Sequence, residues 1–373
     1  MRELSLLIKP ASGNCNMRCA YCFYCDEMRS REVPSRGMMS LATMETIVRK
    51  ALEEAEQFCC FGFQGGEPTL VGLEFYEKVI EFQEKYNHKQ IKIVNTIQTN
   101  GLLIDDVWAR FFAENHFLVG LSIDGAKDTH DSLRFDASGK GTFNACLKAA
   151  KTLTANKAEF NILSVVTRQL AAHPDNLWNF YKKNGFRHIQ FIPCLDRLHE
   201  PPGNNHYSLN EKTFGKFLIR FFDLWYRDFT QGDYYSVRVF DNYVRMLMGG
   251  PPETCGMAGQ CQAYSLIEAD GSVYPCDFYA LDEYKLGDIH SSSFSELLNG
   301  AVAWDFVEAS KIRSEECRSC LYYFICRAGC RRDREPFHEG VPVLNRHCGA
   351  YQAFFAHALA PMREIAQHLS RRR

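Results

Sequence analysis

The stretch of sequence that decides the fold is Leu4–Cys22, LSLLIKPASGNCNMRCAYC. It starts with Leu4–Lys9, an apolar run of strand length, and continues into the spacing Cys15-x3-Cys19-x2-Cys22. Three thiolates this close together can hold three irons of a cubane iron–sulfur cluster. A fourth iron without a protein thiolate can bind a substrate, as open catalytic metal sites do. The loop after the first strand is therefore the candidate reactive site.

Working outward, short apolar runs alternate with longer amphipathic runs as far as about residue 195, a pattern typical of parallel β/α layers. The predicted strands are Leu4–Lys9, Cys59–Gln64, Lys92–Gln98, Leu118–Ile123, Glu159–Val166 and His188–Pro193. The predicted helices are Leu41–Gln57, Leu73–Tyr86, Asp105–Asn115, Thr142–Ala155, Asn176–Asn184 and Asn210–Phe229, with Ser40 and Asp105 as N-caps. Such units close into a barrel or form an open sheet, and both place ligands at the carboxyl ends of the strands.

The character of the sequence changes after about residue 235. Helical periodicity weakens, cysteines cluster, and Ala263–Glu268 and Ser272–Asp277 form a predicted hairpin around an Asp-Gly turn. The loop-like Leu195–Asn205 precedes this change. We therefore expect two domains, residues 1–234 and 235–373.

Composition narrows the function classes. The 373 residues are 46% hydrophobic and 24% charged, as in globular proteins, and a net charge of -2 provides no basic surface for nucleic acid. No apolar run reaches the roughly 20 residues of a membrane span, and we expect no signal peptide because Met1–Leu4 leads directly into a strand-like segment. We expect a cytoplasmic protein with no nucleic-acid or membrane partner.

The 16 cysteines are an unusually large number for a protein of this composition. Disulfides do not explain them, because disulfides are rare in a reducing compartment. Metal or redox chemistry is the leading explanation. Five cysteines are scattered, and we expect most of them to be small buried hydrophobic residues: Cys25, Cys59, Cys60, Cys146 and Cys194. The other eleven are grouped.

The first group resembles the motif of the radical S-adenosylmethionine (SAM) enzymes, with Tyr21 before the last cysteine and Gly65-Gly66-Glu67-Pro68 after the second strand. The resemblance implies a partial (β/α)6 TIM-like barrel and a [4Fe-4S] cluster whose open iron is chelated by SAM. In that family an electron from the cluster splits the sulfonium to give a 5′-deoxyadenosyl radical. The alternative from spacing alone is a structural zinc site with Cys25 as its fourth ligand.

The same resemblance assigns the SAM contacts. Tyr21 and Leu195 would lie at the adenine, and Gly66 near the methionine amino group. Ser122 would lie near the ribose or carboxylate, and Arg134 on the carboxylate, which suits an arginine fork.

The C-terminal cysteines follow the spacing C-x9-G-x4-C from Cys261 and then C-x2-C-x5-C-x3-C from Cys317, and this pattern resembles the SPASM domain. Eight thiols suit two fully ligated clusters. The resemblance assigns one auxiliary [4Fe-4S] cluster to Cys255, Cys261, Cys276 and Cys330, and the other to Cys317, Cys320, Cys326 and Cys348. A pair of four-cysteine zinc sites is the alternative.

Among SPASM proteins the chain most resembles the anaerobic sulfatase-maturating enzymes, in Leu4–Pro10, Phe63–Leu70, Gln98–Gly101 and Tyr274–Tyr279. The resemblance implies oxidation of a Cys or Ser in a sulfatase polypeptide, within Cys-x-Pro-x-Arg or Ser-x-Ala-x-Arg, to Cα-formylglycine. The radical takes a Cβ hydrogen, and a proton and an electron then leave.

Asp277, beside Cys276, matches the family's catalytic base. Gln64 and Tyr24 have ordinary packing explanations and stay outside this set. The chain has no dinucleotide fingerprint, so we expect an external electron donor such as flavodoxin or ferredoxin.

Two other functions stay open from sequence. A radical SAM SPASM maturase that forms thioether or other crosslinks in a ribosomal peptide would share every cluster ligand. A noncatalytic iron–sulfur or zinc protein is favoured only if Cys25 closes the first cluster.

Overall fold

The computed structural model describes residues 1–198, 200–335, 337–338 and 341–371. The chain divides into two compact units that interleave along the sequence. The first unit contains Met1–Ile123, His130–Asn161 and Ala263–Phe306, and the second contains Asp124–Thr129, Ile162–Gln262 and Val307–Arg373. The predicted domain boundary between residues 234 and 235 stays a prediction.

The first unit is built on four parallel strands, which confirms the first four strand predictions. They are β1 (Glu3–Ile8), β2 (Phe58–Phe63), β3 (Lys92–Thr99) and β4 (Leu118–Ser122), each paired in parallel with the next. Leu4, Leu6 and Ile8 are buried while the residues between them are more exposed, so the period of two in β1 reflects one face turned to the core.

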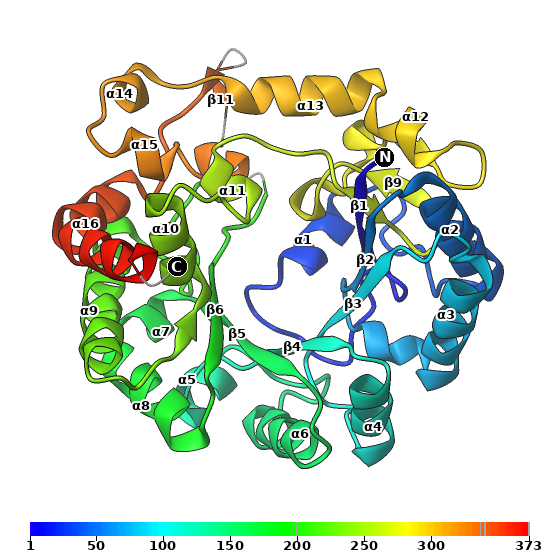
Figure 1. The fold of residues 1–373 in the computed structure, drawn as a ribbon, viewed down its shortest axis with the longest axis horizontal. Helices are drawn as coiled ribbons and strands as arrows, with labels where there is room; N and C mark the ends of the chain where they lie inside the picture. Colours follow the sequence, from blue (N-terminus) through cyan, green and yellow to red (C-terminus); the bar gives the residue numbers. More distant parts are fainter. Residues whose placement is uncertain (199, 336, 339–340, 372–373) are drawn as a thin grey trace. The chain divides into compact units, whose positions relative to one another are not determined.

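Two of the helices between these strands begin after the predicted N-caps Ser40 and Asp105. Ser40 Oγ accepts from the Thr43 amide at 3.0 Å, and the Asp105 carboxylate accepts from the Val107 and Trp108 amides at 3.0 Å each. Helices α2 and α3 pack against one another (Figure 1). The helices up to residue 155 are α1 (Phe23–Arg29), α2 (Leu41–Glu54), α3 (Leu73–Tyr86), α4 (Asp106–Glu114), α5 (Lys127–Asp131) and α6 (Phe143–Ala155).

The predicted hairpin is confirmed, and it extends the sheet of the first unit. Strand β8 (Ser265–Ile267) pairs antiparallel with β9 (Ser272–Tyr274), and β9 pairs with β10 (Gly287–Asp288). On its other side β8 pairs in parallel with β1, so that Leu6 faces Ser265. Because β8 joins β1, the segment that follows β9 is held in the first unit together with the cysteine loop. The helices α12 (Phe294–Leu298) and α13 (Ala301–Lys311) follow.

The second unit contains the remaining predicted strands, apart from the first two residues of β5 (Phe160–Val166). The strands β5, β6 (His188–Pro193) and β7 (Ser236–Val237) pair in parallel in that order. Residues Phe337–His338 and Val341–Pro342 form the short strands β11 and β12. The helices are α7 (Arg168–Ala171), α8 (Pro174–Asn184), α9 (Glu211–Thr230), α10 (Arg238–Leu247), α11 (Cys255–Ala258), α14 (Glu315–Arg318), α15 (Tyr323–Cys326) and α16 (Cys348–Ser370).

The weak helical periodicity after residue 235 hides long helices that were not predicted from the sequence, and α16 alone has 23 residues. Its buried side chains are apolar, with two phenylalanines, three alanines, Met362 and Ile365. They pack on other helices: the Phe354 ring lies 5.8 Å from those of Phe222 in α9 and Phe240 in α10. The apolar stripe of α16 is interrupted by Pro361 and by polar residues, which hides its period in sequence. Within the described ranges, no helix is long and apolar enough to cross a membrane.

Candidate functional site

The cysteine loop after β1 brings the three predicted cluster ligands together. Burial raises the pKa of the Cys15 thiol to about 12, opposed by the Met17 amide, and the neighbouring Cys19 raises it further. Cys19 also raises the pKa of Cys22, so it lies close to both of the other thiols. The side-chain Nδ2 of Asn100, the residue directly after β3, donates to Cys15 Sγ at 3.7 Å. The loop is thus held between the ends of two strands.

The Gly65-Gly66-Glu67-Pro68 segment holds this loop by packing. A Cβ on Gly66 would collide with the Asn14 carbonyl group, and one on Gly65 would lie 2.7 Å from the Ser12 carbonyl oxygen. Gly65 also has a φ of 118°, which favours glycine. The glycines therefore let the loop backbone pass close to the end of β2, a reason additional to the ligand approach expected from sequence.

Glu67 is a structural residue of this motif that sequence reasoning missed. Its buried carboxylate accepts hydrogen bonds from Thr69 Oγ1 at 2.6 Å, Thr99 Oγ1 at 2.7 Å and the Asn100 amide at 2.8 Å. These bonds join the end of β2 to the end of β3, where Asn100 faces Cys15. The signal in the sequence was a charged residue directly after a buried strand, where it needs partners.

Arg134 lies beside the cysteine loop, and Tyr21 is part of that loop. The segment that carries Arg134 runs along the loop: the amides of Arg18 and Ala20 donate to the carbonyls of Phe135 and Leu133 at 2.8 and 2.9 Å. The Arg134 guanidinium lies 3.9 Å from Cys19 Sγ and 5.4 Å from the centre of the Tyr21 ring. A fixed cation at the cysteine loop suits a carboxylate ligand.

All five assigned SAM contacts, those of Tyr21, Gly66, Ser122, Arg134 and Leu195, stay predictions. Ser122 is buried at the end of β4 in the first unit. Leu195 follows β6 in the second unit.

Cys25 lies in α1 and contacts Cys22. A hydrogen bond between the two thiols lowers the pKa of Cys25 and raises that of Cys22. The arginines Arg29 and Arg18 lower the pKa of Cys25 further. This contact makes Cys25 the residue to remove when the ligands of the first cluster are tested.

Asp277 is buried in the first unit and is held by a residue that sequence reasoning set aside. Tyr24, in α1, donates from its hydroxyl to Asp277 Oδ2 at 2.9 Å. The other oxygen, Oδ1, is buried and accepts no hydrogen bond of good geometry from a described residue. Burial raises the pKa of Asp277 to about 6, while Lys9, Tyr24 and Gln64 lower it. Tyr24 thus fixes one carboxylate oxygen, while the other is buried and the Gln64 side chain lies close enough to lower the pKa of Asp277.

A cluster of buried charges lies beside this pair and joins β1, α1 and β8. Lys9 Nζ is 2.8 Å from Glu268 and 3.8 Å from Glu27, and Arg31 is 2.6 Å from Glu268. The Lys9 ammonium also lies 4.8 Å from the centre of the Tyr24 ring. Despite burial, Lys9 and Arg31 lower the pKa of Glu268 to about 2, whereas burial raises that of Glu27 to about 8. At neutral pH, Glu268 is therefore the anion of the cluster.

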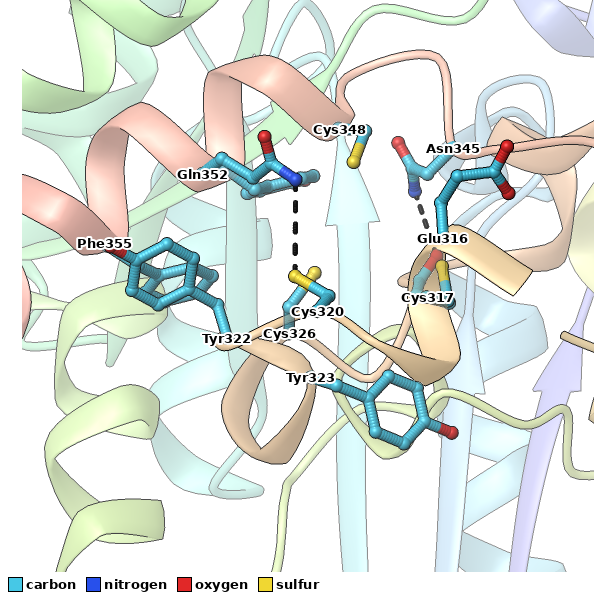
Figure 2. Close-up of a pocket in the computed structure, with 12 residues that line it drawn as sticks. Glu316, Cys317, Cys320, Tyr322, Tyr323, Cys326, Asn345, Cys348, Gln352 and Phe355 are labelled. Carbon is cyan, nitrogen blue, oxygen red and sulfur yellow. Dashed lines mark hydrogen bonds between the residues drawn. The ribbon is translucent and has the colours of Figure 1, made fainter. Parts of the chain in front are cut away.

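The cysteines assigned to one auxiliary cluster share a pocket in the second unit. Figure 2 shows Cys317, Cys320, Cys326 and Cys348 around this pocket, with Gln352 Nε2 4.0 Å from Cys320 Sγ. Burial raises the pKa of Cys326 to about 12, and the other three thiols raise it as well. The four side chains are therefore neighbours.

The other auxiliary group is partly described within the same unit. Burial raises the pKa of Cys330, and Asp333, Cys255 and Cys261 raise it further. Three of the four assigned cysteines are therefore near one another. The Cys261 amide donates to Ser310 Oγ at 2.8 Å. The fourth, Cys276, lies next to Asp277 in the first unit, and its assignment stays a prediction.

The cysteine groups fit iron–sulfur clusters chemically. A buried thiol resists ionisation, and several together do so more strongly unless a bound cation compensates the charge of the thiolates. Iron supplies that compensation. In the described ranges, the side chains form no set of three His, Cys, Asp or Glu arranged around a single ion. The groups are therefore recognised from the effects of the thiols on one another's pKa and, for one group, from the shared pocket. Of the scattered cysteines, Cys59, Cys146 and Cys194 are buried, as expected.

Comparison with known protein families defines the class. The Radical SAM superfamily matches residues 10–169, and the SPASM iron–sulfur cluster-binding domain matches residues 255–321. The α/β fold and the cysteine groups are thus those of a radical SAM enzyme with a SPASM domain, and iron–sulfur clusters and SAM are its cofactors.

Individual relatives show which family within this class the chain belongs to. The chain is 48% identical, over 100% of both chains, to a cysteine-type anaerobic sulfatase-maturating enzyme of Clostridium novyi. It is 31% identical to a serine-type enzyme of Bacteroides thetaiotaomicron, over 95% of this chain and 89% of the relative. A solved structure of native anSMEcpe with bound AdoMet and Cp18Cys peptide matches with a TM-score of 0.95 and 44% identity, over 98% of this chain and 99% of the other. The chain belongs to the anaerobic sulfatase-maturating enzyme family.

Proposed function

We propose that this enzyme oxidises a cysteine in a sulfatase polypeptide to Cα-formylglycine. The cysteine-type relative at 48% identity favours cysteine over serine as the substrate. The peptide-bound relative supports a polypeptide substrate, and the resemblance implies the motif Cys-x-Pro-x-Arg or Ser-x-Ala-x-Arg. When bound, the first cluster and SAM supply the radical that takes the Cβ hydrogen.

The observation that carries the proposal is the buried Asp277 carboxylate. Tyr24 holds Oδ2, and Oδ1 is left to accept a proton from the substrate thiol. Loss of the Cβ hydrogen atom, the thiol proton and one electron converts the cysteine side chain to a thioaldehyde. Water then replaces sulfur, which leaves as hydrogen sulfide, and the product is the aldehyde.

The remaining roles follow from the cysteine groups. Cys15, Cys19 and Cys22 would hold the SAM-binding cluster, with Arg134 and Tyr21 as SAM contacts beside them. The enzyme would hold three clusters in all, the SAM-binding cluster and two auxiliary clusters. The auxiliary clusters would receive the electron left after the proton is lost. An external flavodoxin or ferredoxin would reduce the first cluster, and a cytoplasmic location supplies such carriers and keeps 16 cysteines reduced.

The experiment compares Asp277→Asn with Asp305→Asn, an exposed carboxylate of α13. Both reconstituted proteins receive SAM, dithionite and a peptide that carries Cys-x-Pro-x-Arg. We expect Asp277→Asn to form 5′-deoxyadenosine but to lose formylglycine by ~10²–10⁴-fold, because a positioned base is removed. Wild-type product formation by this variant contradicts the role of Asp277. A matched Ser-x-Ala-x-Arg peptide that reacts faster than the cysteine peptide contradicts the choice of substrate.

A further inference from the structure

Two large apolar side chains are exposed on the segment from Cys320 to Cys326, which ends in helix α15. Leu321 is 79% exposed and Phe324 is 47% exposed, and both lie between Cys320 and Cys326 in sequence. Single exposed apolar residues are ordinary on protein surfaces. Here two of them stand within four residues of one another on a segment whose neighbouring cysteines are assigned to one cluster. We call Leu321 and Phe324 the apolar pair.

The cysteine pocket reaches the surface next to this pair. Cys320 directly precedes Leu321, and its sulfur contacts the side chain of Gln352, an exposed residue of α16 (Figure 2). Cys317 is buried, so the group has an inner and an outer side. A cluster held there would lie within a few bonded atoms of exposed side chains, which is the situation that allows electron exchange with a docked partner.

Two arginines lie beside Phe324 in the apolar pair. The Arg363 guanidinium lies 5.8 Å from the centre of the Phe324 ring, and Arg327 Nε donates to the Phe324 carbonyl oxygen at 3.3 Å. Neither arginine forms an ion pair with a carboxylate among the described residues. Arg318 is 65% exposed, and its charge is offset by Glu315 at 3.4 Å. Glu316 lines the cysteine pocket itself. Apart from Glu316 at the pocket, the charges without an ion pair near Phe324 in the described part of the chain are thus those of Arg327 and Arg363, and this positive charge suits an acidic partner.

We propose that Leu321 and Phe324, with Arg327 and Arg363, form the docking surface for a small acidic one-electron carrier that accepts an electron from the cluster at Cys317, Cys320, Cys326 and Cys348. The inference rests on the proposed function, because oxidation of one cysteine leaves one electron on the enzyme after the hydrogen atom and the proton have gone. The oxidised carrier takes that electron and leaves reduced by one. Small contacts of this kind, apolar at the centre and charged around it, are typical of transient redox encounters.

The test measures electron transfer from the reduced holoenzyme to oxidised flavodoxin by stopped-flow absorbance of the flavodoxin semiquinone. We expect the second-order rate constant to fall with added salt, and Arg363→Glu to lower it by ~10-fold and to flatten the salt dependence. The double variant Leu321→Ser/Phe324→Ser should lower it by a similar ~10-fold, because the central apolar contact is lost. Trp304→Ser, which changes an exposed aromatic residue on α13, is the matched control and should transfer at the wild-type rate.

Electron paramagnetic resonance of the reduced clusters checks that each variant still holds its clusters. If the double variant Leu321→Ser/Phe324→Ser loses a cluster, Arg363→Glu alone tests the proposal. Wild-type rates in Arg363→Glu, or an equal loss of rate in Trp304→Ser, overturn the docking surface. Formylglycine formation with dithionite needs no carrier and is measured on the same proteins. Its failure in the wild type contradicts the proposed function, whereas slow transfer confined to the patch variants supports the docking surface.

Discussion

Replacing Lys9 by methionine tests the buried charge cluster that holds Asp277 and Tyr24 in place. Lys9 is fully buried, and its ammonium is 2.8 Å from Glu268 and 3.8 Å from Glu27. Methionine keeps the length and apolar character of the chain and removes only the charge. The variant therefore leaves Glu268 buried with Arg31 as its remaining cation.

The magnitude follows from these distances. At neutral pH Glu27, with a pKa of about 8, is largely protonated, so the interaction lost is mainly that of Lys9 with Glu268. At 2.8 Å and an effective dielectric constant of about 20, this attraction is about 6 kcal/mol before desolvation is subtracted. Arg31 still compensates part of the charge, and broken buried pairs lose about 3–5 kcal/mol. We expect the free energy of unfolding to fall by about 3 kcal/mol, the lower end of this range.

The assay is anaerobic denaturant unfolding followed by tryptophan fluorescence, with Lys78→Met as the matched control. Lys78 lies 2.7 Å from Glu81, a similar distance, but is 37% exposed. An exposed pair contributes about 0–1 kcal/mol, so the control should unfold close to the wild type. If Lys9→Met and Lys78→Met unfold alike, the buried cluster does not stabilise the first unit as reasoned.

Three further predictions concern the same unit. Burial raises the pKa of Glu27 from 4.5 to about 8, so its contribution to stability is present below pH 4.5 and is lost as pH rises through about 8; Glu27→Gln should flatten this decline in pH-dependent unfolding. Cys25→Ala should retain iron content and SAM cleavage, and loss of the first cluster's spectrum in this variant would identify Cys25 as a ligand. Arg134→Gln should weaken SAM binding by ~10-fold or more while the cluster remains, because a charged hydrogen bond contributes about 1.5–3 kcal/mol, and unchanged affinity by equilibrium dialysis contradicts that contact.

Local physics made much of the fold predictable from sequence. The six parallel strands stand out as apolar runs bounded by polar residues, and Ser40 and Asp105 cap helices as their side-chain chemistry requires. Cysteine spacing identified the groups because cluster ligands recur at short fixed distances along the chain. By contrast, α16 was missed, since its stripe is broken by Pro361 and polar residues.

The partners of Asp277 depended on pairing between distant segments. Sequence predicts a hairpin over residues 263–277 but carries no signal that β8 pairs with β1, which brings Tyr24 and Asp277 within 2.9 Å. The buried ion pairs of Lys9 with Glu268 and Glu27 depend on the same long-range pairing. Glu67 likewise became interpretable only when the ends of β2 and β3 were seen to meet.

The most direct test of the proposed reaction uses a Cys-x-Pro-x-Arg peptide deuterated at the cysteine Cβ, incubated anaerobically with reconstituted enzyme, SAM and dithionite. Mass spectrometry follows the peptide and 5′-deoxyadenosine together. The proposed reaction predicts deuterium in 5′-deoxyadenosine and a peptide that has exchanged sulfur for oxygen with the loss of two side-chain hydrogens. A peptide that is unchanged or internally crosslinked, or 5′-deoxyadenosine without deuterium, contradicts it.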